Sequence, residues 1–199
     1  EAQLAQTVCE VRVSEGHQFF YIHLPDQTLV FDGAATQVLG KPVWHKLTSS
    51  IVGLGRYRGQ NLVWAYDRWN VGDPTSLKFG HLTNTIGSHY GDLVGWEFGT
   101  EIVYNESRGA LFHELELICL TGRSAFGAES TIWTSYTIDG ETWSQERPRT
   151  VGKQGERNKR ITWMQQGHMR HWRAQKFRGT SDAHMSIARL EATLEPLNV

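Results

Sequence analysis

Cysteine is scarce in this sequence, which limits the covalent and metal chemistry open to the protein. The 199 residues include two cysteines, Cys9 and Cys119, which lie far apart in the chain. Neither forms a Cys-x-x-Cys pair or a Cys/His cluster with the spacing of metal ligands. The favoured interpretation is two buried, reduced thiols, and we expect neither a metal site nor a cofactor.

Long apolar runs and targeting signals are missing as well. No apolar run approaches the roughly 18 residues that a membrane-spanning helix needs, so we expect no membrane partner. The chain begins at Glu1 without an initiator methionine, a charged leader or a cleavage signature. These features predict a fragment of a longer protein.

The sequence also lacks the motifs of common enzymes. His113 and Glu114 do not extend to an HExxH zinc motif, because position 117 is a leucine, and strand alternation would place them on opposite faces. No GxSxG, P-loop or GxGxxG motif is present. The nine histidines form no cluster with ligand spacing, and pairs such as His81 and His89 are more typical of surface or turn positions. We therefore expect no catalytic residue.

Aromatic residues and glycine, in contrast, are abundant. The chain holds 8 Trp, 6 Tyr, 8 Phe and 20 Gly, while hydrophobic residues make up only 39%. This composition favours many short strands and turns over amphipathic helices. The length suits one large all-β domain or two small ones.

Short strand patterns fill the first half of the chain. Alternating or aromatic-rich runs between Gly and Pro turn signals predict strands at residues 8–13, 18–24, 28–31 and 42–47. Four short strands in about 40 residues have the size of one β-propeller blade. The pattern recurs after about 43 residues, with strands at 59–67 and 77–82 and a loop at 70–74. We predict an all-β fold of antiparallel sheets with propeller-like blade repeats over residues 1–94; a β-sandwich with long hairpins is the alternative.

Longer strands are expected in residues 95–199, a β-rich hairpin region that we expect to pack with the first part as one unit. Residues 105–109 are predicted to join strands at 101–104 and 110–121 as a hairpin. A strand at 133–136 would pair with a following one across Asp139-Gly140, and strands at 160–165 and 171–177 would pair across Gly167. Residues 185–194 fit either a strand or one helix face, and the strand is favoured because all their neighbours are β.

One turn has a specific chemistry. Asp139, Gly140 and Trp143 lie in TIDGETW, which resembles the Asp-box turn of sialidase-like propellers with one residue missing. In such a turn the carboxylate binds turn amides and the tryptophan packs below, so we predict a structural role. A glycan-binding or glycan-cleaving propeller is the alternative function, with a carboxylate pair drawn from Asp32, Asp67, Asp73, Glu97, Glu101 and Asp139.

Positive charge is concentrated near the C-terminal end. Residues 147–178 contain ten of the 20 Lys and Arg against one acid, Glu156, so ten bases and 20 acids remain elsewhere. Such asymmetry is typical of a surface that meets a partner of opposite sign. Strand alternation would turn these cations outward, away from the aromatic residues, and would permit contact with a DNA backbone but no sequence readout. The predicted interface residues are Arg147, Arg149, Lys153, Arg157, Lys159, Arg160, Arg170 and Arg173.

Several segments also carry a family resemblance. They are LPDQTLVFD at residues 24–32, VGDPTS at 71–76, DGETWS at 139–144, and the ending that runs from RITW at 160–163 through KFRG at 176–179 to SIARLE at 186–191. Together they resemble the packaged-DNA stabilisation protein of short-tailed bacteriophages, a family also called the tail accessory factor or tail hub. The resemblance covers essentially the whole chain, which would form the C-terminal part, under half, of a full-length member.

The resemblance implies a virion structural protein without enzymatic activity. It implies a hexameric ring below the portal and its adaptor protein, which closes the portal channel after genome packaging and stabilises the packaged DNA. It also implies attachment of the tail needle and tailspikes, and a location in the virion tail, with assembly in the host cytoplasm. A closed ring requires a heterologous interface, in which two different patches of each subunit meet.

Overall fold

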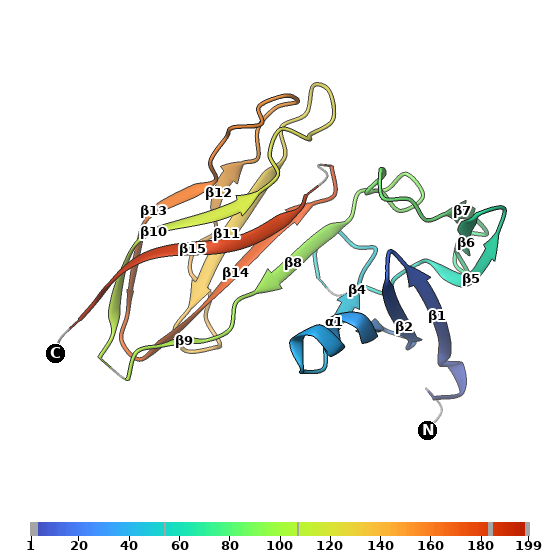
Figure 1. Cartoon of the computed structure of the whole chain (residues 1–199), viewed down its shortest axis with the longest axis horizontal. Coiled ribbons are helices and arrows are strands. Elements are labelled where there is room, and N and C mark those ends of the chain that lie inside the picture. Colours follow the sequence, from blue (N-terminus) through green and yellow to red (C-terminus); the bar gives the residue numbers. More distant parts are fainter. Residues whose placement is uncertain (1–3, 54, 107, 183–184, 198–199) are drawn as a thin grey trace. The chain divides into compact units, whose positions relative to one another are not determined.

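The computed structural model describes residues 4–53, 55–106, 108–182 and 185–197, and it confirms the all-β prediction. The chain divides into two compact units, Glu1–Gly95 and Trp96–Val199, which we call unit 1 and unit 2. Antiparallel sheets make up both (Figure 1). That the two parts pack together as one unit stays a prediction.

The first sheet of unit 1 is a four-stranded antiparallel meander. After a short 3₁₀ turn, η1 (Leu4–Gln6), its strands are β1 (Val8–Ser14), β2 (His17–His23), β3 (Thr28–Asp32) and β4 (Trp44–Leu47), in that spatial order. Glu15 and Gly16 both have positive φ angles, 51° and 82°, which suits the tight turn between β1 and β2. The predicted strands at residues 8–13, 18–24, 28–31 and 42–47 all correspond to these elements.

A helix that the sequence analysis did not predict follows β3. It is α1 (Gly33–Leu39), and the carboxylate of Asp32 accepts a 3.0 Å hydrogen bond from the Ala35 amide at its N-terminus. Gly40 ends the helix in the left-handed conformation, with φ at 67°. Among the described residues no helix has the length and apolar character needed to cross a membrane.

The second sheet of unit 1 has three strands. They are β5 (Gln60–Ala65), β6 (Arg68–Gly72) and β7 (Phe79–His81), with β6 in the centre. The prediction of one strand at 59–67 and a loop at 70–74 is wrong in part, because Asn70 and Val71 belong to β6. Tyr66 and Asp67, with φ angles of 55° and 57°, form the turn. Tyrosine is unusual at turn positions with a positive φ angle, so the sequence analysis did not predict this turn.

Unit 2 contains two antiparallel sheets. One has the order β13-β10-β15, with β10 (Ala110–Cys119) between β13 (Thr162–Met169) and β15 (Ile187–Pro196). The other has the order β12-β11-β14-β8, and β9 also pairs with β14. Its strands are β8 (Gly95–Gly99), β9 (Val103–Tyr104), β11 (Thr131–Thr137), β12 (Arg147–Thr150) and β14 (Trp172–Thr180). The favoured strand assignment of the last run is confirmed by β15.

The core of unit 2 lies between these two sheets. The rings of Trp163 on β13 and Phe177 on β14 are 5.6 Å apart and both side chains are fully buried. Leu115 on β10 and Ile132 on β11 belong to the same buried cluster. A register shift between Phe112 and Glu114 marks a bulge in β10. It lets Phe112 and Leu115 both face the core, although they are three residues apart.

Two predicted hairpins of unit 2 do not form. β13 pairs with β10 while β14 pairs with β11, so the predicted pairing across Gly167 is wrong. Gly167 lies inside β13, where an added Cβ would stand 3.2 Å from the Tyr136 hydroxyl oxygen. β9 likewise pairs with β14 and not with β10, so residues 105–109 link two sheets. Alternation locates a strand, but it does not identify the strand's partner.

The two cysteines differ in environment. Cys119 is half-buried, and burial raises the pKa of its thiol to about 11. Cys9 is exposed on β1, which contradicts the expectation of a buried thiol. Both are free.

Candidate functional site

The predicted basic face of unit 2 is spread over strands and loops that differ in exposure. Arg149, Lys153, Arg157, Arg160 and Arg170 are exposed, and Arg147 and Lys159 are half-buried. Arg173 is the exception, because it is buried in unit 2. The geometry therefore separates these cations into three groups.

The first group, on β12, covers the edge of β13. The Arg147 guanidinium donates a 2.9 Å hydrogen bond to the Gln165 carbonyl, and the Arg149 Nε donates one of 2.7 Å to the Thr162 carbonyl. Both acceptors are backbone groups of β13, which is an edge strand of its sheet. These arginines therefore satisfy carbonyls that would otherwise be open to another strand.

The second group is paired with carboxylates. Arg160 Nε donates a 2.8 Å hydrogen bond to Glu116 and its guanidinium also lies near Glu114. Hydrogen bonding to Arg160 lowers the pKa of Glu116. Lys159 pairs with Glu129 at 3.0 Å and approaches Glu156. Intramolecular partners thus neutralise much of this charge.

The third group consists of the remaining exposed cations, Lys153, Arg157 and Arg170. Within the described part of the chain their side chains form no ion pair or hydrogen bond. Lys153 and Arg157 lie in one loop between β12 and β13, while Arg170 lies in the link between β13 and β14. The charge of Lys153 contributes, after Lys159 and Thr150, to the lowered pKa of Glu129 and is thus partly compensated, whereas the charges of Arg157 and Arg170 are available to a partner.

Arg173 does not belong to an outer face, and this corrects the alternation argument. Its side chain is 1% exposed, and its guanidinium carbon lies 3.7 Å from the Tyr136 ring centroid and 4.4 Å from that of Phe112. It donates hydrogen bonds to the Gln166 carbonyl and the Gln175 side chain. Burial lowers the pKa of Arg173 to about 10. The buried side of β14 carries Arg173, Gln175 and Phe177, so the alternation of this strand places Arg173 inside unit 2.

The turn around Asp139 is organised by its carboxylate. Asp139 Oδ1 accepts hydrogen bonds from the amides of Glu141 and Thr142 at 2.9 and 2.8 Å, and Thr137 donates to the same oxygen. Hydrogen bonds to the Asp139 carboxylate hold its pKa below the usual range, and those from Thr142 contribute most. Trp143 is not buried below the turn; it is half-exposed, with the Lys176 ammonium 4.3 Å from its ring centroid.

A cavity that the sequence analysis did not predict lies in unit 1. Its volume is about 410 Å³, and aromatic, aliphatic and hydroxyl side chains line it without a carboxylate, lysine or arginine. The lining residues come from the segment before β5, from β6 and β7, and from the loop beyond β7. They are Tyr57, Gly59, Val71, Phe79, Gly80, His81, Leu82, Thr83, Ile86, Ser88, His89, Tyr90 and Gly91.

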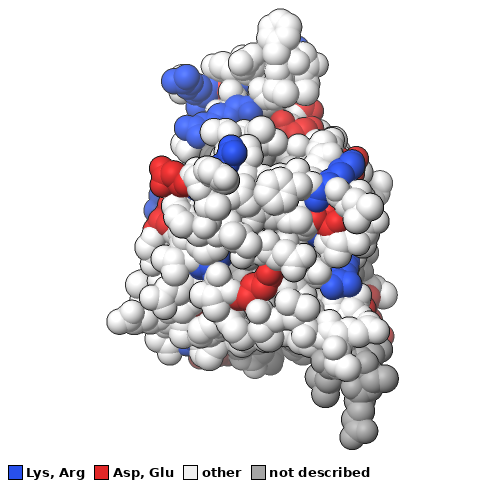
Figure 2. All heavy atoms as spheres, turned by 90° about the vertical axis from the view of Figure 1, so that its right-hand side faces the viewer, with Lys and Arg blue, Asp and Glu red and all other residues white. Residues whose placement is uncertain are grey.

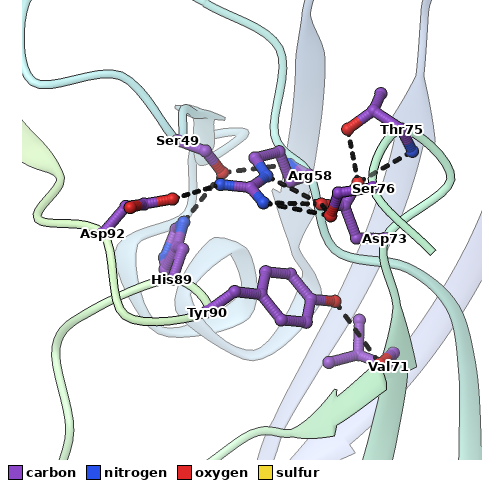
Figure 3. Close-up of polar contacts among 9 residues, drawn as sticks. All are labelled: Ser49, Arg58, Val71, Asp73, Thr75, Ser76, His89, Tyr90 and Asp92. Atoms are coloured by element: carbon purple, nitrogen blue, oxygen red, sulfur yellow. Dashed lines mark hydrogen bonds and ion pairs between the residues drawn. The ribbon is translucent and has the colours of Figure 1, made fainter. Parts of the chain in front are cut away.

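Arg58 holds the wall of this cavity in place (Figure 3). Its guanidinium contacts Asp73 Oδ2 and Asp92 Oδ2, each at 2.7 Å, and its carbon lies 5.3 Å from the Tyr90 ring centroid. Asp73 also accepts hydrogen bonds from Thr75 and Ser76. Burial alone would raise the pKa of Asp73, but hydrogen bonds from Ser76, Thr75 and Arg58 outweigh it and hold the pKa well below its usual range.

Two polar side chains bring hydrogen-bonding capacity to the cavity. Tyr57 is 7% exposed, and its hydroxyl has no hydrogen-bond partner in the described part of the chain. Its ring lies over Gly59, where an added Cβ would stand 2.6 Å from the hydroxyl oxygen. His89 makes a 2.8 Å hydrogen bond to Ser49 through Nδ1, and burial lowers its pKa. The ring of Tyr57 packs edge-on against that of His89.

Several of the carboxylates considered for glycosidase chemistry serve other contacts. Asp32 caps α1, Asp73 binds Arg58, and Glu97 lies 3.8 Å from the Lys176 ammonium. Among the described residues no group of three or more His, Cys, Asp or Glu side chains could hold a metal ion. Of these candidates, Asp73 lies near another carboxylate, that of Asp92, which the sequence analysis did not consider, and Arg58 contacts both (Figure 3).

Comparison with known proteins gives matches along nearly the whole chain. A family model described as bacteriophage P22 Gp10, beta-propeller, matches residues 1–87, and one described as bacteriophage P22 Gp10, beta-sandwich, matches residues 95–195. The tail hub protein gp10 of Salmonella phage P22 is 23% identical over 193 residues. These cover 97% of this chain but 39% of the relative, so the chain spans about two fifths of that protein's length.

Proposed function

The chain belongs to the family of bacteriophage P22 Gp10, and from this membership we propose that it is a structural protein of a phage tail. The observation that carries the proposal is the order of the matches. The propeller and sandwich parts of the family follow one another along the chain as units 1 and 2 do. The relative named as a tail hub matches across both.

The finer role follows from the resemblance of the sequence to tail hubs. The protein closes the portal channel after genome packaging, stabilises the packaged DNA, and connects the portal adaptor to the tail needle and tailspikes. It acts in the virion as a hexameric ring and has no enzymatic activity. A ring of identical subunits needs two different complementary patches on each.

One of these patches is the set of unpaired cations on unit 2. Lys153, Arg157 and Arg170 are exposed, and their side chains form no ion pair with a carboxylate among the described residues. A cation that already has an intramolecular partner adds little binding free energy when a second partner covers it. An unpaired cation, in contrast, can form a new charge-assisted hydrogen bond. We therefore assign these three residues to a contact with an acidic surface of a neighbouring subunit or of the adaptor.

Complementation of heads that lack the protein tests both levels of the proposal. The full-length protein should restore DNA-filled heads to a state that retains DNA and accepts tailspikes. Replacing Lys153, Arg157 and Arg170 together by glutamate should abolish incorporation into tails. The matched control is the triple change to glutamine at Arg147, Arg149 and Arg160, which already have intramolecular partners.

The outcomes separate the family role from the interface. Failure of the unmodified protein to restore DNA retention contradicts the tail function itself. Normal incorporation of the charge-reversed variant contradicts only the assignment of the three cations. Contact with packaged DNA is tested by the salt dependence of duplex binding, since a slope near zero excludes phosphate contacts.

A further inference from the structure

Unit 2 carries a highly exposed aromatic side chain in the link between β10 and β11. Phe126 is 93% exposed. It lies in a turn that the Ala128 amide closes with a 3.0 Å hydrogen bond to the Ala125 carbonyl. Gly127 has a φ angle of 79°, which suits the third residue of a type II turn. Phe126 is the second residue of this turn and therefore projects from its corner.

A second loop holds this link in place. Residues 151–161, between β12 and β13, are hydrogen-bonded to residues 121–130 through the backbone. The Gly122 amide donates to the Val151 carbonyl at 3.3 Å, and the Gly155 amide donates to the Gly122 carbonyl at 3.0 Å. Both loops lie at the same end of unit 2 (Figure 1). We call these two loops the tip of unit 2.

The base of the tip is closed within unit 2. Thr121, Ser124, Ser130 and Val151 are all buried, and the Ser124 hydroxyl donates a 2.9 Å hydrogen bond to a carbonyl of the second loop. The exposure of Phe126 is therefore not a gap in the core of unit 2. Because the two loops hold each other, the tip is ordered before any partner binds, which lowers the entropic cost of binding.

Two unpaired arginines accompany Phe126 in the tip. Arg123 and Arg157 are exposed, and in the described part of the chain neither side chain forms an ion pair or hydrogen bond. The Arg157 carbonyl accepts a 3.0 Å hydrogen bond from the Thr121 hydroxyl, which brings the segments that carry the two arginines together. The tip is uppermost in Figure 2, where Lys and Arg atoms gather beside a smaller group of Asp and Glu atoms.

The carboxylates of the tip distinguish between classes of negatively charged partner. Glu129 pairs with Lys159 at 3.0 Å, and Glu156 accepts a 2.8 Å hydrogen bond from the Lys153 amide. Their side chains are still 35% and 52% exposed. A nucleic-acid backbone or an anionic membrane has negative charge throughout and would meet these carboxylates as well. A protein surface can place its own carboxylates opposite the arginines alone, so the charges favour a protein.

We propose that the tip docks on another protein of the tail, with Phe126 in an apolar pocket and with carboxylates at the rim of that pocket paired with Arg123 and Arg157. The inference rests on the proposed function and adds the anchoring residue and the chemistry of the partner surface. Aromatic and arginine side chains most often dominate the free energy of protein interfaces. An apolar centre within a polar rim is the usual arrangement.

Competition for heads that lack the protein tests the anchor. Equal amounts of native full-length protein and a variant compete for a limiting number of heads, and mass spectrometry measures their ratio in the assembled tails. Phe126→Ala should be incorporated about thirtyfold less than the native protein, and Arg123→Glu about tenfold less. The matched control is Met164→Ala, which truncates an exposed apolar side chain of β13 and should be incorporated within about twofold.

Two further measurements separate docking from folding and identify the partner. Phe126 is almost fully exposed, so Phe126→Ala should leave the urea midpoint of unit 2 unchanged. Phe126→p-benzoylphenylalanine places a photoreactive group at the anchor. Irradiation of assembled tails should join position 126 to a different polypeptide chain, within a segment that contains Asp or Glu.

Several results would overturn the proposal while leaving the proposed function intact. They are equal incorporation of Phe126→Ala and the native protein, a photoadduct with DNA or lipid, and a photoadduct of unchanged mass, which indicates a contact within the same chain. In each of these cases the native protein still restores DNA retention. Failure of the native protein to do so contradicts the proposed function and, with it, this inference.

Discussion

The interiors of the two units are built from different kinds of residue. Unit 2 has a continuous apolar cluster, from Ala110 on β10 to Phe177 on β14. In unit 1 the buried apolar residues Tyr21, Val30, Tyr57, Val71 and Val94 are accompanied by the buried polar residues His23, Thr28, Asp32, Gln60, Asn70 and Asp73. Unit 2 also buries polar side chains, from Thr121 to Gln175, but around a continuous apolar cluster. Packing therefore contributes more to the stability of unit 2 than to that of unit 1, where the buried polar residues among those described outnumber the apolar ones.

Two arginines illustrate the difference. Arg58 in unit 1 is held by two carboxylates. Arg173 in unit 2 lies between the rings of Phe112 and Tyr136, and no carboxylate among the described residues pairs with it. Charge compensates the first cation, while aromatic faces, the Gln166 carbonyl and the Gln175 side-chain oxygen compensate the second. The same residue type should thus respond to substitution in different ways.

The largest effect is expected from a cavity in the core of unit 2. Trp163→Ala removes a side chain that is 0% exposed, and it should lower the free energy of unfolding by about 4 kcal/mol. Urea unfolding followed by the exchange of core amides in β10 measures it. Trp143→Ala, at a half-exposed position, is the control and should change stability far less. Similar losses from both would remove the contrast between packing and surface.

Unit 1 should be most sensitive to the loss of a buried carboxylate. Asp73→Ala leaves Arg58 without its buried partner and should destabilise unit 1 by about 3 kcal/mol. Exchange of the Val71 amide reports on it. Asp92 binds the same guanidinium but its side chain is 62% exposed, so Asp92→Ala should cost less than about 1 kcal/mol. Equal costs would show that burial does not distinguish the two pairs.

An intermediate effect is expected at the aromatic site of Arg173. Arg173→Lys keeps the charge but loses the planar group between the two rings, and should cost about 2 kcal/mol. The measurement is the urea midpoint of unit 2. Arg157→Lys, at an exposed position, should leave the midpoint unchanged. A native midpoint for Arg173→Lys would show that charge alone suffices there.

The smallest effect is expected in how the stability of unit 1 depends on acidic pH. The pKa of Asp73 is lowered in the folded chain, from about 3.9 when unfolded. Its contribution to stability is therefore present above about pH 4 and is lost as the pH falls through the folded pKa. Between pH 4 and pH 2, the stability of unit 1 should fall less steeply in Asp73→Asn than in the native chain, measured by urea unfolding. Equal slopes would assign the acid response to other groups.

The sequence predicted strands better than their partners. Alternation located β1, β10 and β15, although only β10 among these three strands has buried residues. It did not predict that β13 and β14 belong to different sheets, because Gly167 was interpreted as a turn. Its positive φ, 79°, is real, but what excludes a side chain there is Tyr136 on another strand. Such a constraint is tertiary and leaves no local pattern.

The candidate sites show the same limit. The charge count located the basic segment, but not which cations pair with Glu116 or Glu129. The cavity of unit 1 was not predicted, because its lining comes from segments between Tyr57 and Gly91 that lie apart in the sequence. A local signal existed only for Asp73, which begins the Asp-Pro-Thr-Ser turn that binds Arg58.

The long ladder between β10 and β15 has a mechanical consequence. The two strands are antiparallel in a register that extends from Ala110 opposite Pro196 to Cys119 opposite Ile187, and their hydrogen bonds lie perpendicular to the strands. A force applied along β15 loads these bonds together, in shear. A force applied across the sheet opens them one after another. The C-terminal strand of unit 2 therefore resists tension along its axis more strongly than peeling from its sheet.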